Sequence, residues 1–316
     1  MVDLKEMFGG GGENGSFLGL PKAGELSDLT ADIVIYGADC ATPYASVGAY
    51  CAGGPAAIRA GAAAYAGDMG RVNFDLGGPI LPTGITAVDY GDLATDPQTP
   101  GQNRAQIADA TKQILAAGAV PILLGGDDSL PIPFLQAYAG RGPLSIVQID
   151  AHIDWRDEVQ QERLGLSSTM RRASEMEHVS QIIQVGARGI GSAGMGSLEA
   201  AQEWGAHIFP AHQLEFGGLQ AAVNLISDGS DVVICFDCDA LDPSIMPSVI
   251  APTAGGLSYA QALWLIKAIA DKAQIVGFDL VEFMAEADQN GHGARTAAQL
   301  LASVLGIIGR QVANAR

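Results

Sequence analysis

Six short apolar runs, rich in valine and isoleucine, constrain the fold of this 316-residue chain more than any other feature. They are continuous instead of alternating with polar residues, which is typical of strands covered on both faces in a parallel sheet. We therefore expect such a sheet. The runs lie at residues 32–38, 119–126, 144–151, 181–188, 231–239 and 275–283.

Amphipathic segments with helical spacing separate these runs, at residues 55–67, 103–118, 196–205, 258–272 and 294–310. The alternation of strands and helices predicts one α/β domain spanning residues 31–316, with no linker or internal repeat that divides it. Residues 1–30 are rich in glycine and weakly patterned. We expect them to form an N-terminal arm that serves as a flexible lid or a subunit contact.

The charge balance narrows the range of partners. The formal net charge is −18, with 17 lysine and arginine residues against 35 aspartate and glutamate residues. Nucleic-acid binding depends on clustered basic groups, so this composition argues against it. An acidic field favours a cationic substrate, although the same balance also keeps a protein soluble.

The sequence predicts a soluble, cytoplasmic protein. No apolar run approaches the roughly 18 uncharged residues of a membrane-spanning helix, and the first residues lack the basic-then-apolar order of a secretory signal. The four cysteines are too sparse for a disulfide scaffold. Cys235 and Cys238 lie three apart in an expected strand, so they point to opposite faces and do not share a metal ion.

Acidic side chains and one imidazole follow the carboxyl ends of four expected strands. The segments are GGDDS at 125–129, DAHID at 150–154, DCD at 237–239 and DLVEF at 279–283. Functional groups in open α/β sheets gather beyond the carboxyl ends of the strands. We therefore expect these four segments to meet.

Their spacing suggests a metal site. In an extended segment, residues i, i+2 and i+4 share a face, so Asp150, His152 and Asp154 can converge, and Asp237 and Asp239 project together. Carboxylates at the end of an apolar strand repel one another unless a positive charge lies between them. Two divalent ions about 3.5 Å apart would supply that charge. The alternative is that these acids cap helices or pair with arginines, but the chain has few basic residues.

In this order, the four segments resemble the motifs of the ureohydrolase (arginase/agmatinase) family. The segment PSVIAPTAGGL at 247–257 resembles the family's loop after the second aspartate motif, and GGPAAIR at 53–59 resembles its early helix start. The resemblance covers roughly residues 30–310. It implies a three-layer αβα sandwich and an agmatinase-like hydrolase of linear guanidino or amidine compounds. It also implies two divalent metal ions, typically Mn²⁺, with Ni²⁺ as the alternative.

The resemblance also implies roles for individual residues. The metal ligands would be Asp150, His152, Asp154, Asp237 and Asp239. In the family, a hydroxide that bridges the two ions attacks the guanidino carbon, and urea or a urea-like product leaves with an amine. Glu282 matches the acid that faces the guanidinium group, and we expect it to be catalytic together with Asp154.

Family specificity lies in loops around the mouth of the site, which we expect at residues 10–30, 155–170 and 189–200. Besides Glu282, we expect Trp155, Arg156 and Ser167 to contact the substrate. Arg156 would either meet a substrate carboxylate or pair with its neighbour Asp157 or Glu158.

Two positions depart from the family pattern. Where the family motif GGDHS supplies a histidine ligand, this chain has Asp128, which we expect to serve as the sixth ligand. The ligands then comprise five carboxylates and one imidazole, which suits hard ions such as Mn²⁺ or Mg²⁺. Aligned on Arg171 and Arg172, the family's proton-relay histidine is replaced by Leu166. Loss of a general acid commonly costs about 10²–10⁴ in rate.

Two functional interpretations therefore stay open. The chain is either a working hydrolase for an unusual guanidino or amidine substrate, or a weakly active or inactive homologue that stabilises an active paralogous partner. The intact carboxylates favour the first. The family also implies assembly into a homo-oligomer (trimer or hexamer), or into a hetero-oligomer with a paralogue.

Overall fold

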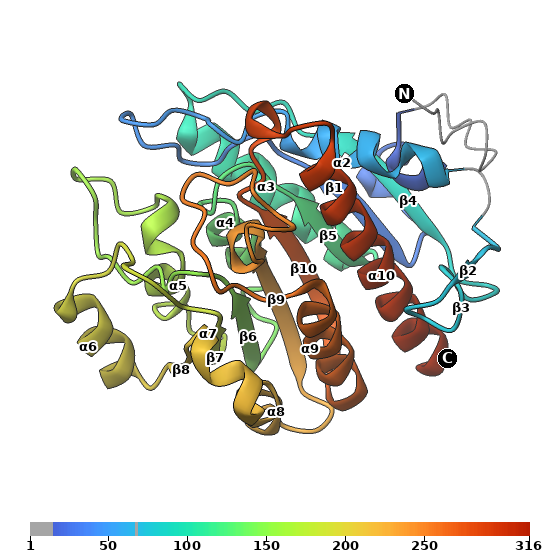
Figure 1. Ribbon diagram of the computed structural model, residues 1–316. Coiled ribbons are helices and arrows are strands. Elements are labelled where there is room, and N and C mark those ends of the chain that lie inside the picture. Colours follow the sequence, from blue (N-terminus) through green and yellow to red (C-terminus); the bar gives the residue numbers. More distant parts are fainter. Residues whose placement is uncertain (1–14, 67–68) are drawn as a thin grey trace.

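The computed structural model describes residues 15–66 and 69–316 and has an eight-stranded sheet at its centre (Figure 1). The strand order is β4-β1-β5-β10-β9-β6-β7-β8, and each neighbouring pair is parallel. In chain order the strands are β1 (Ile33–Gly37), β4 (Ala87–Asp92), β5 (Val120–Leu124), β6 (Leu144–Ile149), β7 (Val179–Val185), β8 (His207–Phe209), β9 (Asp231–Asp237) and β10 (Gln274–Val281). A separate antiparallel hairpin pairs β2 (Val72–Asn73) with β3 (Gly78–Pro79).

Helices cover both faces of the sheet (Figure 1). One layer contains α2 (Gly54–Ala62), α8 (Leu219–Asn224), α9 (Tyr259–Lys272) and α10 (His292–Asn314). The other contains α3 (Pro100–Ala116), α4 (Pro131–Gln136), α5 (Thr169–Ala173) and α6 (Met195–Trp204). The short α7 (Ala211–Gln213) follows β8. The prediction of a three-layer αβα sandwich is confirmed.

The strands alternate their side chains between two hydrophobic cores. In β9, Val232 and Ile234 pack in the core beneath α9 and α10, whereas Val233 and Cys235 pack in the core beneath α3 and α4. Cys238 lies in the first of these cores, on the opposite side from Cys235, and all four cysteines are buried and free. The two thiols therefore lie in different cores.

Some side chains before the expected boundary at residue 30 belong to the core. Phe17 and Leu18 are buried in the short helical turn η1 (Phe17–Gly19), and Leu26 is buried in η2 (Leu26–Asp28). The backbone N–H of Phe17 donates to Asp89 in β4. The glycine-rich residues 9–14, expected to act as a lid or subunit contact, lie outside the described residues.

Helix α10 departs from a second expectation. The sequence predicts no candidate membrane span, whereas α10, by length and composition alone, qualifies as one. However, 67% of its apolar window is buried inside the protein, where it packs on α2 and α9. We interpret it as a core helix, because core helices share this composition.

The order of the central strands positions the functional site. The four motif-bearing strands β5, β10, β9 and β6 are consecutive in the sheet. Because all four are parallel, their carboxyl ends lie at one edge. The four acidic segments therefore meet there, as their positions in the sequence predicted.

Candidate active site

The predicted ligands lie together at the carboxyl ends of these strands. Their carboxylates are buried, and the imidazole is partly exposed, at 21%. The set consists of Asp128, Asp150, His152, Asp154, Asp237 and Asp239.

Two groups of these residues have the geometry of metal sites. Asp150, His152 and Asp239 form one, and Asp128, Asp150 and Asp237 form the other. Within each group the potential ligand atoms lie within 4.8 Å of one another. Both groups contain Asp150, so this carboxylate is common to the two candidate metal sites.

His152 carries the positive charge of the first group. Its Nδ1 lies 3.4 Å from Oδ1 of Asp150 and 3.0 Å from Oδ2 of Asp239. Burial alone would lower the pKa of His152, but the hydrogen bonds and charges of these two carboxylates raise that pKa to about 12. Burial tends to raise the pKa of Asp150, but the contact with His152 holds that pKa below its ordinary value.

The DAHID segment reaches this geometry without the extended conformation that we expected. Strand β6 ends at Ile149, and Asp154 has a left-handed backbone with φ of 47°. The carboxylates of Asp150 and Asp154 nevertheless converge, because the Nε2 of Gln148 donates to both at 2.6 Å. Burial and the charge of Asp150 raise the pKa of Asp154. The sequence did not identify Gln148 as part of the site.

Two buried oxygens of the GGDDS segment have no hydrogen-bond partner within the described chain: Oδ2 of Asp127 and Oδ2 of Asp128. Burial raises the pKa of both side chains, and the charges of Asp154 and Asp150 raise that of Asp128 further. Such orphaned acceptors are rare in native proteins unless an ion or water satisfies them.

No arginine in the described ranges forms an ion pair with a cluster carboxylate, although Nη2 of Arg188 donates to the backbone carbonyl of Asp239 at 2.7 Å. In the described ranges, Arg59 pairs with Asp89 and Asp92, and Arg172 pairs with Asp157. The described ion pairs that reach the cluster carboxylates come from His152 alone. The alternative that these acids pair with arginines is therefore not supported, and the donor set fits two divalent cations.

Glu282 lies beside the cluster, and its carboxylate has three neighbours that donate to it. The Tyr50 hydroxyl donates to Oε1 at 2.5 Å, and the backbone N–H of Asp128 donates to the same oxygen at 2.9 Å. The Cys51 thiol lies 3.9 Å from Oε2. Burial, with a smaller contribution from the charge of Asp127, raises the pKa of Glu282 to about 8. Glu282 also has a left-handed backbone, with φ of 64°, a strain that often marks functional sites.

Trp155 does not line the site, which contradicts its predicted role in substrate binding. Its side chain is 2% exposed, its Nε1 donates to Gln184, and its ring packs against Trp204. The left-handed turn at Asp154 precedes this inward orientation. Trp155 is therefore a core residue that anchors the DAHID segment.

Arg156 has neither acidic neighbour as a partner. Its Nε donates to the carbonyl of Ser192 at 2.8 Å, and its Nη2 contacts the same oxygen. Asp157 pairs with Arg163 and Arg172 instead.

Tyr44 contacts the segment around Leu166, where the family's relay histidine is missing. Its hydroxyl accepts the backbone N–H of Ser167 at 3.3 Å, next to Leu166. Its ring lies over Gly165, where an added Cβ would come within 2.0 Å of Cε1 of Tyr44. Ser167 itself is 6% exposed. Sequence reasoning missed Tyr44 and Tyr50 because both lie in a loop with no strand or helix pattern.

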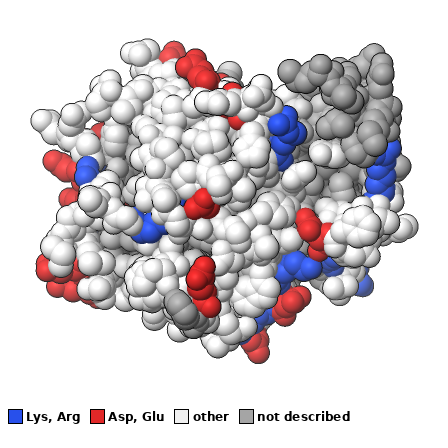
Figure 2. Space-filling model, viewed as in Figure 1, with Lys and Arg blue, Asp and Glu red and all other residues white. Residues whose placement is uncertain are grey.

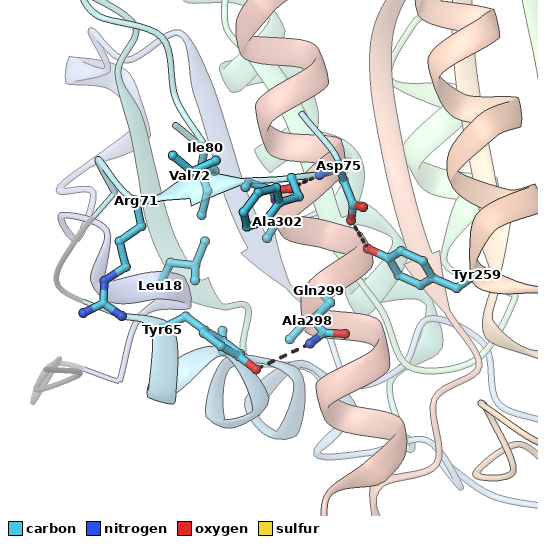
Figure 3. Close-up of a pocket in the computed structure, with 13 residues that line it drawn as sticks. Leu18, Tyr65, Arg71, Val72, Asp75, Ile80, Tyr259, Ala298, Gln299 and Ala302 are labelled. Carbon is cyan, nitrogen blue, oxygen red and sulfur yellow. Dashed lines mark hydrogen bonds between the residues drawn. The ribbon is translucent and has the colours of Figure 1, made fainter. Parts of the chain in front are cut away.

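A mainly apolar surface pocket lies elsewhere (Figure 3). It has a volume of about 440 Å³ and lies between the β2–β3 hairpin and α10, where Tyr65 contacts Gln299 and Asp75 contacts Tyr259. None of the cluster carboxylates lines it. On the face in Figure 2, charged groups form small separate clusters with wide uncharged areas between them.

Comparison with known proteins agrees with this geometry. Residues 31–306 match the model of the arginase family. The chain is 38% identical to an N(1)-aminopropylagmatine ureohydrolase from Thermus thermophilus over 62% of this chain and 65% of that protein, slightly less than two thirds of the relative's length. It is 31% identical to the mitochondrial guanidino acid hydrolase of Homo sapiens, over 75% of this chain and 68% of that protein.

A solved structure extends the likeness over almost the whole chain. The proclavaminate amidino hydrolase from Streptomyces clavuligerus superposes with a TM-score of 0.78 at 26% identity, covering 94% of this chain and 97% of that one. The family match covers most of the sequence and includes all four acidic motifs. The chain belongs to the arginase family.

Proposed function

We propose that this protein is a two-metal hydrolase that cleaves a C–N bond of a small guanidino compound, releasing urea or a urea-like product and an amine. The observation that carries the proposal is the pair of ligand groups that share Asp150, with Glu282 beside them. The orphaned oxygen of Asp128 supports a role for this residue as a ligand in the histidine's place.

The ions would be held by Asp150, His152 and Asp239 on one side and by Asp128, Asp150 and Asp237 on the other. When bound, they would lower the pKa of water and polarise the guanidino group. Four carboxylates among these five ligands favour a hard cation, so we propose Mn²⁺, with Ni²⁺ as the second candidate.

The protein's own groups would orient the substrate and carry protons. Glu282 would hold the guanidinium cation, whose charge favours the ionised carboxylate. The oxygen of water stays on the guanidino carbon, the bond to the substituted nitrogen breaks, and both water protons leave with the amine as an ammonium group. Burial and the charge of Asp150 raise the pKa of Asp154, which suits it to hold one of these protons in transit.

The position of Arg156 supports the proposal that the substrate also bears a carboxylate. Its guanidinium is fixed on the carbonyl of Ser192 and has no carboxylate partner among the described ion pairs. The neighbouring Gly191 lies against the active site, since a Cβ added there would be 3.9 Å from Cδ2 of His152. The names of the relatives include both a guanidino acid hydrolase and an aminopropylagmatine ureohydrolase. We propose that Arg156 favours guanidino acids.

The test is urea release from a panel of guanidino compounds, with protein reconstituted with Mn²⁺ or Ni²⁺. Turnover of at least one compound, lost on chelation, is expected. In Arg156→Gln, kcat/KM should fall about tenfold or more for guanidino acids and should change little for agmatine. A wild-type protein that is inert with both metals would contradict the proposal and favour a role as partner of an active paralogue.

We also propose that the protein is a cytoplasmic homo-oligomer. Four free, buried cysteines support a reducing compartment. The β2–β3 region exposes Phe74 at 93% and Val72 at 61%, which supports a contact between copies or with a paralogous chain. Light scattering of the purified chain tests the assembly, and a monomer at micromolar concentration would contradict it.

A further inference from the structure

Loop 44–50 is fixed at both ends against the active site. At its start, the Tyr44 hydroxyl receives the N–H of Ser167, and the Tyr44 carbonyl accepts N–H groups from Val47 and Gly48 to close a turn. Just beyond its end, the carboxylate of Asp39 receives the backbone N–H of Gly53. These hydrogen bonds therefore set the position of the loop.

Helix α2 brings the end of this loop to the carboxylates. A Cβ at Gly54, the first residue of α2, would come within 2.9 Å of the carbonyl of Phe283 and within 3.1 Å of the carbonyl of Gly125. These carbonyls belong to the DLVEF and GGDDS segments. Tyr50, four residues before Gly54, is thereby close enough to the site for its hydroxyl to donate to Glu282.

The Tyr50 side chain connects the mouth of the site to its interior. The residue is partly exposed, yet its hydroxyl lies 2.5 Å from Oε1 of Glu282, which is 3% exposed. The phenol ring therefore extends from the buried Glu282 carboxylate to the surface. A substrate substituent that leaves the site on this side must pass the ring.

Tyr50 also determines which oxygen of Glu282 is available. Oε1 already accepts from Tyr50 and from the backbone N–H of Asp128, which uses both of its lone pairs. Oε2 has only the weak thiol donor of Cys51, at 3.9 Å. A guanidinium group that binds here meets one free oxygen instead of the two that a bidentate pair uses.

On the basis of the proposed function, we propose that Tyr50 is the specificity-determining residue of this site, restricting it to guanidino compounds with short substituents and presenting Oε2 of Glu282 as the single acceptor. The site is then selective for compounds such as guanidinoacetate or guanidinopropionate over agmatine and longer guanidino amines.

The test measures kcat and KM for a series of guanidino compounds of increasing chain length, in metal-loaded wild type, Tyr50→Ala and Tyr50→Phe. In Tyr50→Ala, the ratio of kcat/KM for long over short compounds should rise at least tenfold. Tyr50→Phe keeps the ring, so this ratio should stay within about threefold of wild type while KM for short compounds changes more than kcat. Tyr65→Phe is the matched control. The Tyr65 hydroxyl contacts Gln299 in the pocket of Figure 3, so its removal should change neither kcat nor KM.

Equal length preference in wild type and Tyr50→Ala would overturn the inference. If Tyr50→Ala fails to fold, the kinetics of Tyr50→Phe test the inference. An unchanged KM with a reduced kcat for short compounds in Tyr50→Phe would then overturn the inference. If wild type turns over no compound, the proposed function fails separately. The role of Tyr50 is then tested by calorimetry, which measures the binding of guanidinium and of agmatine to the metal-loaded proteins. The ratio of the affinity for agmatine to that for guanidinium should rise at least tenfold in Tyr50→Ala. The same ratio in Tyr50→Ala and wild type would overturn the inference.

Discussion

Nδ1 of His152 lies 3.0 Å from Oδ2 of Asp239, so an imidazole that follows β6 contacts a carboxylate that follows β9. The two strands are neighbours in the sheet, and the contact joins the DAHID and DCD motifs. In the metal-free protein, the imidazolium ion places positive charge where we propose that a divalent cation binds.

Metal binding should therefore release protons. The contacts with Asp150 and Asp239 raise the pKa of His152 to about 12, against the effect of burial, and a metal ligand must be deprotonated. Burial and neighbouring carboxylates also raise the pKa of Asp128 and of Asp237. The affinity for Mn²⁺ should thus increase from pH 6 to pH 8. Calorimetry in buffers of different ionisation enthalpy measures the released protons, and an affinity independent of pH would contradict this.

The metal-free protein should lose stability as the pH rises. Burial raises the pKa of Asp279 from 3.8 to about 8, and burial with the charge of Asp127 raises that of Glu282 from 4.5 to about 8. Both groups hold protons in the folded state that the unfolded chain releases. Their contribution is fully present below pH about 4 and is lost as the pH rises through about 8.

The variant Asp279→Asn isolates this effect, because its amide does not ionise. At pH 9, with chelator present, we expect its free energy of unfolding to exceed that of wild type by at least about 1.4 kcal/mol, the equivalent of one pKa unit. Denaturant unfolding at pH 5 and pH 9 measures the difference. Parallel pH profiles for the two proteins would show that Asp279 does not carry the effect.

Asp128→Asn should weaken one of the two metal sites. An amide keeps the shape but removes the charge of a ligand that groups with Asp150 and Asp237. We expect the affinity for the second ion to fall at least about tenfold, the scale on which nearby groups affect metal binding. Elemental analysis after dialysis should find about one ion per chain. The exposed Asp109→Asn serves as the control, and an unchanged metal content in Asp128→Asn would exclude Asp128 as a ligand.

Gly165→Ala should destabilise the packing of the Tyr44 ring against the segment around Leu166. A Cβ there would lie 2.0 Å from Cε1 of the buried Tyr44 ring, so the ring must move from Ser167. Overpacking of this kind costs about 1–3 kcal/mol of stability. Thermal unfolding measures it against Gly24→Ala, where the added Cβ has no neighbour within 4 Å. Equal melting temperatures for the two variants would contradict this packing.

The six strands that the sequence predicted are those whose burial on both faces requires continuous apolar residues. The two strands of the eight-stranded sheet that it missed, β4 and β8, lie at the edges of that sheet. β4 contains Asp89 and Asp92, which bind Arg59, and β8 has only three residues. Edge strands are not covered on both sides, so they lack the apolar pattern.

The acidic cluster was predictable for a related reason. The carboxyl ends of parallel strands share an edge of the sheet. Motifs that directly follow such strands are therefore expected to lie close to one another. The contacts of Tyr50, Tyr44 and Gln148 depend on packing between segments far apart in sequence, and no local pattern encodes them. Trp155 illustrates the converse, since adjacency to Asp154 in sequence did not place its ring in the site.

The central claim is that this chain holds two divalent ions and uses them on a guanidino compound. The most direct test is elemental mass spectrometry of the Mn²⁺- or Ni²⁺-reconstituted protein, paired with urea release on the same sample. We predict about two ions per chain and turnover of at least one guanidino compound. A chain that stays free of metal and inert after reconstitution would contradict the account.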